Sequence, residues 1–411
     1  MTIWLSHKDS REFDRVDFDP TDHAGDGVYN LFRGLGVPRE ECIQNDEQAE
    51  VFTGHILDIW CSGDQKLCDF LLDWMAHLVQ RPGVKMVCTP VLQGGQGAGK
   101  GIIVQMLGDI LGHEHFIAAT SLDAVTGTFQ EDKAKTNLLT FLDECTFAGD
   151  LRQSSILKGL LSEAVRRWEA KYVNPIRIRN WSNYIVASNY EEIVYVEVDD
   201  RRWLCLRVND KYAGPQTPES QAYFNTLAVV PIHHIAHLLY NRDISKFNPR
   251  AMPSTDYKRY QKRINFDTVH GWVELCLQDG QFDTTYLTTG AQDELVSPAR
   301  WVEGVGVMSK KALYASYTHF AKQPGQKFKK VVTETSLFKS LYRLTGSVAT
   351  KRGSKGIQVP CVEFAGLEKC RAAFAKMVHE PEWEWEVVGD KPQVSSPSSS
   401  CNSSSNSYWA Y

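Results

Sequence analysis

The chain contains the stretch Gly94-Gly95-Gln96-Gly97-Ala98-Gly99-Lys100-Gly101. It follows the pattern of a phosphate-binding loop, in which glycine, four residues and Gly-Lys precede serine or threonine. Glycines let backbone N–H groups close around phosphate oxygens, and Lys100 is expected to reach the β- and γ-phosphates. The last position departs from the pattern because Gly101 carries no hydroxyl group.

The residues on either side of this loop predict a strand and a helix. Residues 86–92 form an apolar run that predicts a buried strand. Apolar residues with helical spacing follow the loop: Ile102, Ile103, Met106, Leu107, Ile110 and Leu111. Gly112 then predicts the end of the helix. Strand, glycine loop and helix form the context in which this loop binds a nucleotide, whereas a glycine-rich turn before an ordinary helix is the alternative.

Length and composition indicate a soluble, intracellular protein. The 411 residues suffice for two or three domains, and 43% hydrophobic with 23% charged residues is ordinary for globular chains. No apolar run reaches the length of a membrane span, and residues 1–11 lack the apolar core of a secretory signal. Ten cysteines without a Cys-x-x-Cys pair favour a reducing compartment over a zinc ribbon or a disulfide framework.

Segment composition predicts an α/β protein with four parts. Residues 1–84 are expected to form a helical N-terminal region, with the clearest helix at 66–80. Residues 85–250 alternate apolar runs with helical patterns, which predicts an α/β core, and another helix is expected at 228–240. Residues 257–390 form a basic, helical region, and the Ser-rich tail 391–411 is expected to be disordered.

The basic region is a candidate nucleic-acid surface. The net charge is −5 overall, yet residues 300–379 hold fifteen Lys and Arg against four Asp and Glu. Clustered positive charge is the electrostatic signature of a nucleic-acid contact, and a solvated basic face is the alternative.

An acidic pair ends a second predicted strand. Residues 136–142 are mostly apolar and lead into Asp143 and Glu144. Such a strand brings its end to the edge of the sheet, where open α/β sheets bind ligands. Asp143 is expected to hold Mg²⁺ directly or through water, and Glu144 to polarise the attacking water. A solvated acidic pair is the alternative, and the phosphate loop some forty residues earlier favours the functional interpretation.

A third predicted strand ends in an asparagine, and two arginines follow it. Residues 183–188 are largely apolar and precede Asn189, which is expected to orient the water or contact the γ-phosphate. Arg201 and Arg202 stand just before another apolar run at 204–206. An arginine delivered by a neighbouring subunit can stabilise transition-state charge, whereas paired charges in a surface turn are the alternative.

Together these motifs resemble superfamily 3 helicases. The chain looks like the helicase part of the primase-helicases of phages, virophages and large DNA viruses, over residues 1–210 and more loosely over 290–376. The resemblance implies an AAA+-like ATPase that binds Mg-ATP through Lys100, Asp143 and Glu144, with Asn189 as the sensor. It implies Arg202 as the arginine finger, with Arg201 second. It also implies a hexameric ring that unwinds single-stranded or forked DNA, with a primase or polymerase as partner, in the host cytoplasm, nucleus or viral factory.

The resemblance also implies two sets of nucleic-acid contacts. The family places a pore hairpin between the acidic strand and the sensor strand, here at about residues 157–178, and the implied contacts are Arg166, Arg167, Lys171 and Tyr172. In the basic region, helices expected at 309–320 and 335–342 precede a basic turn at 351–357. This order suits a winged-helix-like module in which the second helix and Lys351, Arg352 and Lys355 contact phosphates.

Gly101 leaves other functions open. Many phosphate-loop enzymes bind Mg²⁺ through a Ser or Thr hydroxyl at this position, so the metal here is expected to rely on Asp143, water and the phosphates. The alternatives are a DNA-packaging or initiator ATPase that moves on duplex DNA, and a non-catalytic nucleotide-binding scaffold for a primase or polymerase. No primase motif is evident, so the chain is either a separate helicase or part of a longer primase-helicase.

Overall fold

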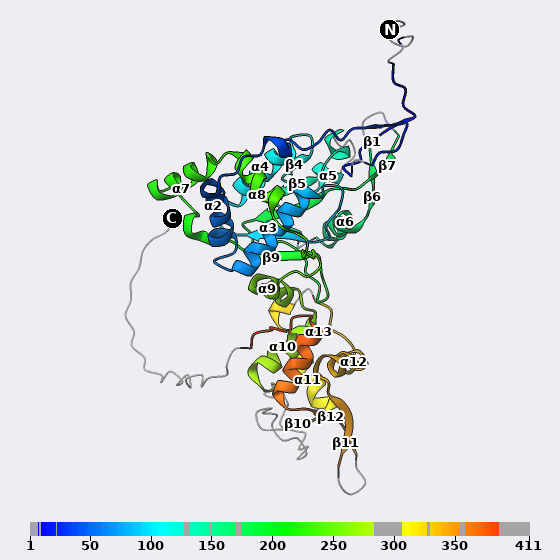
Figure 1. The fold of residues 1–411 in the computed structure, drawn as a ribbon. Helices are drawn as coiled ribbons and strands as arrows, with labels where there is room; N and C mark the ends of the chain where they lie inside the picture. The colour runs from blue at the N-terminus through cyan, green and yellow to red at the C-terminus, as the bar shows by residue number, and fades with distance from the viewer. Residues whose placement is uncertain are drawn as a thin grey trace, which may run out of the picture. The chain divides into compact units, whose positions relative to one another are not determined.

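The structure is a computed structural model that describes residues 7, 10–21, 23–126, 132–147, 150–169, 174–282, 306–326, 329–353 and 358–385 (Figure 1). The chain divides into two compact units. The first runs to Phe266 and also takes in Val378–Glu382, and the second contains Asp267–Met377 and the residues from Trp383 onward. No helix within the described ranges is long and apolar enough to cross a membrane. The tail predicted at 391–411 lies outside the described residues.

A five-stranded parallel sheet forms the centre of the first unit, in the order β4-β5-β8-β3-β9. Its strands are β4 (Phe116–Ala119), β5 (Leu139–Asp143), β8 (Asn183–Ser188), β3 (Thr89–Gln93) and β9 (Trp203–Arg207). Every residue of β3 and β8 is buried, which explains their continuous apolar runs in the sequence. The prediction of a mixed α/β fold with a central sheet is confirmed.

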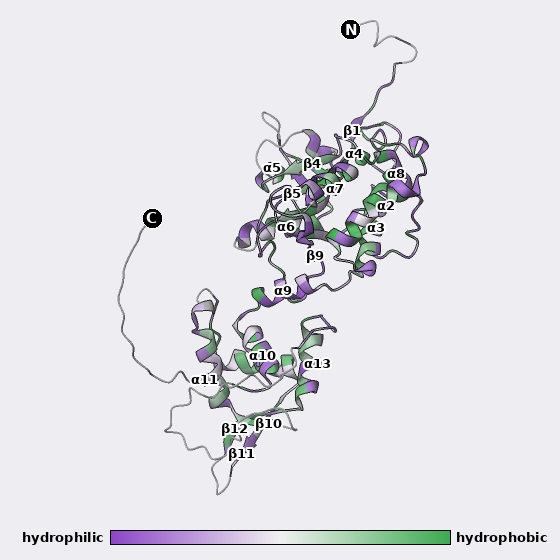
Figure 2. Cartoon of the chain, turned by 90° about the vertical axis from the view of Figure 1, so that its left-hand side faces the viewer, coloured by the Kyte–Doolittle hydropathy of each residue, from purple (hydrophilic) through white to green (hydrophobic). Residues whose placement is uncertain are grey.

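Helices cover both faces of this sheet. Successive residues of a strand point to opposite faces, so neighbouring residues pack into different cores. Leu92 of β3 packs into a core with α3 (Gln65–Gln80), α4 (Lys100–Leu111) and α8 (Ile232–Asn241). The helices carry hydrophobic and hydrophilic residues side by side, as expected when only one face is buried (Figure 2).

The opposite face of the sheet has its own core. Val91, the neighbour of Leu92, packs there with residues of α6 (Leu151–Ser162) and α9 (Asp256–Asn265). The two cores hold the phosphate-loop strand from both sides, so the loop is carried by a rigid element.

The N-terminal helices pack within the same unit as the sheet. Helix α2 (Asp46–His55) continues into a π-helical turn, Ile56–Trp60, and both α2 and α3 contact α8. The helix predicted at 228–240 is confirmed as α8, except at its start: α7 (Pro218–Ala228) ends first and α8 begins after Pro231. A proline disfavours helical geometry in the residue before it, which explains the break.

Several short elements complete the first unit. Strands β1 (Arg15–Asp17) and β2 (Val28–Asn30) pair in parallel, and β6 (Val165–Trp168) and β7 (Ile176–Arg179) form an antiparallel hairpin. The remaining helical turns are α5 (Asp123–Thr126), η1 (Arg39–Glu41), η3 (Asp132–Lys135) and η4 (Asp210–Tyr212). The hairpin occupies only part of the segment predicted to carry it.

The second unit combines helices with a small antiparallel sheet in the order β10-β12-β11. Along the chain its elements are α10 (Thr268–Asp279), β10 (Gly306–Ser309), α11 (Lys310–Ala321), η6 (Pro324–Gln326), α12 (Glu334–Thr345), β11 (Val348–Arg352), β12 (Val359–Phe364) and α13 (Leu367–Met377). The helices predicted at 309–320 and 335–342 are confirmed as α11 and α12. The basic turn predicted at 351–357 begins within a strand, because Lys351 and Arg352 are the last two residues of β11.

Candidate active site

Three neighbouring strands end side by side at one edge of the sheet. The register aligns Gln93 of β3 with Ser188 of β8, and β8 separates β3 from β5, which ends at Asp143. The phosphate loop follows Gln93, the exposed Asn189 follows Ser188, and Glu144 follows Asp143. Parallel strands direct their carboxyl ends to the same edge. The three motifs predicted from the sequence therefore lie at one edge, with the asparagine strand in the middle.

The phosphate loop has the backbone geometry that its glycines permit. Gly97 and Gly99 have φ values of 79° and 85°, in the left-handed region that favours glycine. Lys100 begins α4 and is only 7% exposed. Its Nζ donates hydrogen bonds to the carbonyl oxygens of Gly94 at 2.5 Å and Gly95 at 2.9 Å. The ammonium group thus lies inside the loop.

The charge of Lys100 links the loop to the acidic strand end. Burial lowers the pKa of Lys100, and the nearby carboxylates of Glu144, Asp143 and Asp210 act in the opposite direction. These carboxylates therefore lie close enough to stabilise the ammonium. The structure brings together Lys100, Asp143 and Glu144, as predicted, and adds an acid that the prediction did not include.

Asp210 braces the start of the loop. Its Oδ1 accepts a hydrogen bond from the backbone N–H of Gly95 at 2.7 Å. Four residues further on, the N–H of Gly214 donates to the carbonyl of Gln96 at 2.9 Å. Asp210 lies 115 residues after Gly95 in the sequence, so no local pattern could reveal the contact. The sequence indicates a role for Asp210 only through its position just after β9, at the same edge of the sheet.

His55 braces the end of the loop. The side chain is 1% exposed, with Nε2 3.2 Å from the carbonyl oxygen of Gly99 and Nδ1 2.9 Å from the hydroxyl of Tyr223. Burial lowers the pKa of His55 to about 4, although the hydrogen bond to the Gly99 carbonyl opposes the shift. A neutral ring with its proton on Nε2 satisfies both bonds. A helix that precedes the sheet in the chain therefore fixes the phosphate loop.

The acidic pair has an unusual backbone. Glu144 has a φ of 55°, which is rare for a residue with a side chain, and its N–H donates to Asp143 Oδ1 at 3.1 Å. Such strain concentrates at functional sites and costs about 1–3 kcal/mol. Asp143 is half-buried and Glu144 is exposed. The pair therefore has one shielded and one accessible carboxylate.

Asp143 suits a magnesium ion bound together with phosphates. Mg²⁺ in phosphate sites usually takes one or two carboxylates, substrate oxygens and water. In the part of the chain that the structure describes, no group of three His, Cys, Asp or Glu side chains is placed to hold a metal alone. The donors present thus fit a metal that arrives with the nucleotide.

The two arginines differ in their surroundings. Arg202 donates to Asp200 through Nη2 at 2.6 Å and Nε at 3.2 Å, and the Asp200 side chain is fully buried. Arg202 also lies 3.6 Å from Glu197. Arg201 is exposed and forms no hydrogen bond or ion pair with the described residues. The preference for Arg202 as the finger is not supported, since its guanidinium is already bound within the chain.

The arginines also lie at the opposite edge of the sheet from the phosphate loop. The N–H of Thr89, at the start of β3, donates to the carbonyl of Arg202 at 2.7 Å. The five residues of β3 separate this edge from the loop, which at about 3.3 Å per residue is roughly 16 Å. Arg201 therefore does not belong to the phosphate site of its own chain.

The hairpin contacts predicted for nucleic acid fall into three groups. Arg167 is exposed and pairs with Glu169 at 2.9 Å. Arg166, also predicted as a nucleic-acid contact, is 7% exposed and donates to the carbonyl of Ala134. In β6, residues alternate between exposed and buried, and Arg166 takes an inward position. Lys171 and Tyr172 lie outside the described residues.

In the second unit, Lys351 and Arg352 lie at the exposed end of β11. Arg352 pairs with Glu363 at 3.1 Å, whereas Lys351 has no partner among the described residues. Lys355 lies outside the described residues. Lys351 is therefore the described residue of this group that is available to a phosphate.

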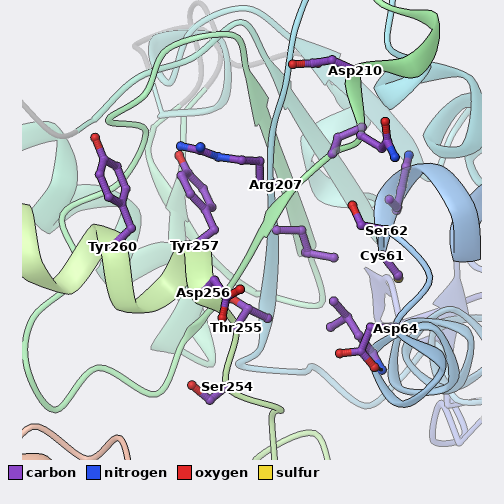
Figure 3. A pocket seen from close by; sticks show the side chains of 15 residues that line it. Cys61, Ser62, Asp64, Arg207, Asp210, Ser254, Thr255, Asp256, Tyr257 and Tyr260 are labelled. Carbon is purple, nitrogen blue, oxygen red and sulfur yellow. Dashed lines mark hydrogen bonds between the residues drawn. The ribbon is translucent and has the colours of Figure 1, made fainter. Parts of the chain in front are cut away.

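A cavity of about 750 Å³ opens beyond the end of β9 in the first unit (Figure 3). Arg207 lies over the rings of Tyr257 and Tyr260, at 5.4 and 5.6 Å from their centroids. The turn at Ser62 and Asp64 lines the other side, and Asp210 lies at one end. Asp210 thus connects the wall of this cavity to the phosphate loop.

Comparison with known proteins finds relatives of the site region. A family of unknown function (DUF5906) matches residues 92–202, the segment that runs from the phosphate loop to the paired arginines. The chain is 27% identical over 195 residues to a DNA primase-polymerase of Nitratiruptor phage NrS-1. That match covers 44% of this chain and 25% of the phage protein, so the similarity concerns about a quarter of the relative's length.

Solved structures show a shared fold. Two apo structures of the NrS-1 C-terminal region match with TM-scores of 0.62 and 0.63, each at 18% sequence identity. The first match covers 85% of this chain and 84% of that chain, and the second covers 85% of both. The chain is therefore similar over part of its length to a phage DNA primase-polymerase, and it shares the fold of the NrS-1 C-terminal region.

Proposed function

We propose that the chain is an ATP-dependent DNA helicase of the superfamily 3 type, with an AAA+-like core that works as a hexameric ring. The observation that carries the proposal is the common edge formed by Lys100, Asp143, Glu144 and Asn189 on three adjacent strands. The relation to a phage primase-polymerase supports a role in DNA replication.

Each residue has a role that follows from its place. Lys100 and the loop N–H groups would hold the β- and γ-phosphates of ATP, and Asp143 would hold Mg²⁺. The metal supplies charge neutralisation for phosphoryl transfer. Glu144, the accessible carboxylate, would accept a proton from the attacking water. Asn189 lies between loop and acids, where it can orient that water.

The position of Arg201 supports the proposal of a ring. Because it lies roughly 16 Å along the sheet from the loop of its own chain, it can stabilise transferred phosphate only in a neighbouring copy. Arg202 and Asp200 then act as positioning residues that fix the backbone beside Arg201. One chain therefore holds two incomplete half-sites, and association completes them.

The second unit suits a winged-helix module that contacts DNA. Its order of helix, strand, two helices and two strands, with the first strand paired to the last, is that of a helix-turn-helix followed by a wing. Lys339 and Arg343 lie exposed on α12, and Lys351 lies at the start of the wing. Such residues neutralise phosphates without reading sequence.

The test is ATP hydrolysis and strand separation on a forked DNA substrate. We expect DNA-stimulated hydrolysis and unwinding in the wild type, with both lost in Lys100→Ala and Glu144→Gln. Glu144→Gln should still bind nucleotide, because that carboxylate acts on water rather than on the phosphates. Hydrolysis that moves the protein along duplex DNA without opening a fork would favour a packaging or initiator motor.

Gly101 favours one second candidate. A phosphate loop without the metal-binding hydroxyl suits a scaffold that binds nucleotide without turning it over, and recruits a primase or polymerase. Tight nucleotide binding with no hydrolysis in the assembled wild type, with or without DNA, would establish that function instead.

A further inference from the structure

Two basic side chains lie in the interior of the first unit, away from the phosphate loop. Arg166 takes an inward position in β6 and is 7% exposed. Lys85 lies just before β3, and its Nζ donates at 2.6 Å to the carbonyl of Leu160 near the end of α6. Within the described ranges, no carboxylate forms an ion pair with either side chain. Both charges therefore lack the partner that a buried charge usually has.

The guanidinium of Arg166 carries donors that the protein does not satisfy. Nη2 donates to the carbonyl of Ala134, whereas Nε and Nη1 are buried and have no acceptor among the described residues. The hydroxyl of Tyr184, whose side chain is 1% exposed, lacks a partner there as well. The nearby Ser182 hydroxyl donates instead to the carbonyl of Asn137 at 3.2 Å. Buried polar groups are normally hydrogen-bonded, so this set of donors points to a bound ion or water.

These groups lie within electrostatic reach of one another. Lys85 Nζ lies 5.5 Å from the ring centroid of Tyr184. Burial, followed by the charge of Arg166, lowers the pKa of Lys85 to about 7, although the carboxylate of Glu163 opposes the shift. Water can satisfy the donors, but a neutral molecule leaves the repulsion between the two cations in place. An anion removes both costs at once.

We propose that Arg166, Lys85 and Tyr184 form a binding site for a small, free oxyanion of the phosphate class. Guanidinium, ammonium and phenol groups all donate, and the first two are common ligands of phosphate. Arg166 and Tyr184 are more than nine-tenths buried, which suits a free anion better than a nucleic-acid strand with sugars on both sides of each phosphate. The five residues of β3 separate Lys85 from the phosphate loop, so this is a second site, independent of the proposed function.

The test titrates inorganic phosphate and sulfate into the full chain carrying Lys100→Ala, so that the phosphate loop does not dominate anion binding. Isothermal titration calorimetry should show saturable binding of both oxyanions, and chloride at matched ionic strength should show none. The absence of saturable binding would overturn the site. Binding of a single-stranded oligonucleotide at these side chains, without binding of free phosphate, would also overturn it.

Tyr184→Phe separates a ligand site from a structural role. The ring remains and a buried hydroxyl without a partner disappears, so the anion-free protein should be at least as stable as its Lys100→Ala parent. Anion affinity should nevertheless fall about threefold or more, because one donor to a charged oxygen is lost. Lys85→Met should lower it about tenfold or more, since that change removes a donor and a charge. Unchanged anion affinity in both variants would overturn the proposal.

Lys158→Met, in the same background, is the matched control. The Lys158 side chain is 13% exposed and also lies on α6, but it already pairs with Glu197 at 3.0 Å. We expect this variant to keep the anion affinity of its parent, whatever its stability. A loss equal to that of Lys85→Met would show that the effect comes from general charge and would overturn the site.

Proton uptake gives a readout that a structural role would not change. An anion beside Lys85 stabilises the ammonium, so its pKa should rise from about 7 when the site fills. Sulfate binding at about pH 7.5 should therefore take up protons, measured by calorimetry in buffers that differ in ionisation enthalpy. Lys85→Met should abolish the uptake. Equal uptake with and without Lys85 would contradict its place in the site.

Discussion

The geometry of Gly99 predicts a large difference between two alanine substitutions in the same loop. A Cβ atom at Gly99 would lie 2.6 Å from Cε1 of His55 and 2.8 Å from Cε1 of Phe224, with φ at +85°. Two residues on, a Cβ at Gly101 would meet only Phe141, at 3.8 Å, in ordinary helical geometry. Gly99→Ala should therefore disturb the loop, and Gly101→Ala should not.

The expected magnitudes follow from these distances. A left-handed residue with a side chain costs roughly 1–2 kcal/mol, and forcing an extra carbon against packed rings costs about 1–3 kcal/mol more. The free energy of unfolding should fall by about 2–5 kcal/mol in Gly99→Ala, out of a typical 5–15 kcal/mol. Gly101→Ala should change it by about 1 kcal/mol or less, and in the stabilising direction, because alanine favours a helix over glycine.

Urea unfolding of both variants measures this difference, and titration with a non-hydrolysable ATP analogue measures its effect on the loop. Gly99→Ala should lose nucleotide affinity even at low temperature, where it remains folded, since His55 can no longer hold the loop in place. A Gly99→Ala protein within about 0.5 kcal/mol of wild type would refute the reasoning, given that surface substitutions change stability by no more than that. Equal destabilisation by Gly101→Ala would refute it as well.

Two further predictions concern a buried histidine and an exposed lysine. The pKa of His55 is about 4 in the folded chain and about 6.5 in the unfolded chain, so between these values only the unfolded chain binds the proton. The stabilising effect of the neutral ring is therefore complete above pH 6.5 and is lost as the pH falls toward 4. Urea unfolding should show that the stability of the wild type falls by about 2 kcal/mol more between pH 7 and pH 5 than that of His55→Gln; equal slopes would contradict a neutral, buried ring. Lys351→Ala should weaken DNA binding equally for all sequences, and should lower by about 1 the slope of log K against log salt concentration, where K is the binding constant. Fluorescence anisotropy measures both effects, and Lys246→Ala in the first unit is the control. An unchanged slope would show that Lys351 does not contact DNA.

The elements around the site could be predicted because their signals are local. The phosphate loop combines a buried strand, a glycine run and a helix within about 25 residues, and the structure places β3 and α4 there. Asp143 ends an apolar strand, and Glu144 and Asn189 each directly follow one, so their place at the edge of the sheet follows from strand direction alone. If the strands are assumed to be parallel, the sequence also predicts that these residues lie at the same edge of the sheet.

The residues that brace the loop could not be predicted, because their contacts are distant in sequence. His55 lies 44 residues before Gly99, and Asp210 lies 115 residues after Gly95. A histidine in a helix and an aspartate after a strand carry no signal of a partner so far away. Their roles arise only when α2 and the end of β9 pack against the loop.

The choice between the paired arginines depended on a burial that the sequence does not show. Sequence order made Arg202 attractive because it precedes the aromatic residue of β9, but the fully buried Asp200 binds its guanidinium through two nitrogens. A buried carboxylate needs a partner, and removing that partner would cost about 3–5 kcal/mol. The guanidinium of Arg202 is therefore already bound by a carboxylate of its own chain.

The packing around position 101 does not explain why this position lacks a hydroxyl group. A Cβ there would have its nearest neighbour at 3.8 Å, so the surrounding side chains leave room for serine. The glycines at 97 and 99 differ, since their positive φ values favour glycine whatever the neighbours. The fold thus requires glycine at two positions of the loop and permits a hydroxyl residue at the third. Since Gly101 offers no hydroxyl, a metal bound with the nucleotide would depend on Asp143 and the phosphates, and we expect hydrolysis to be unusually sensitive to loss of that single carboxylate.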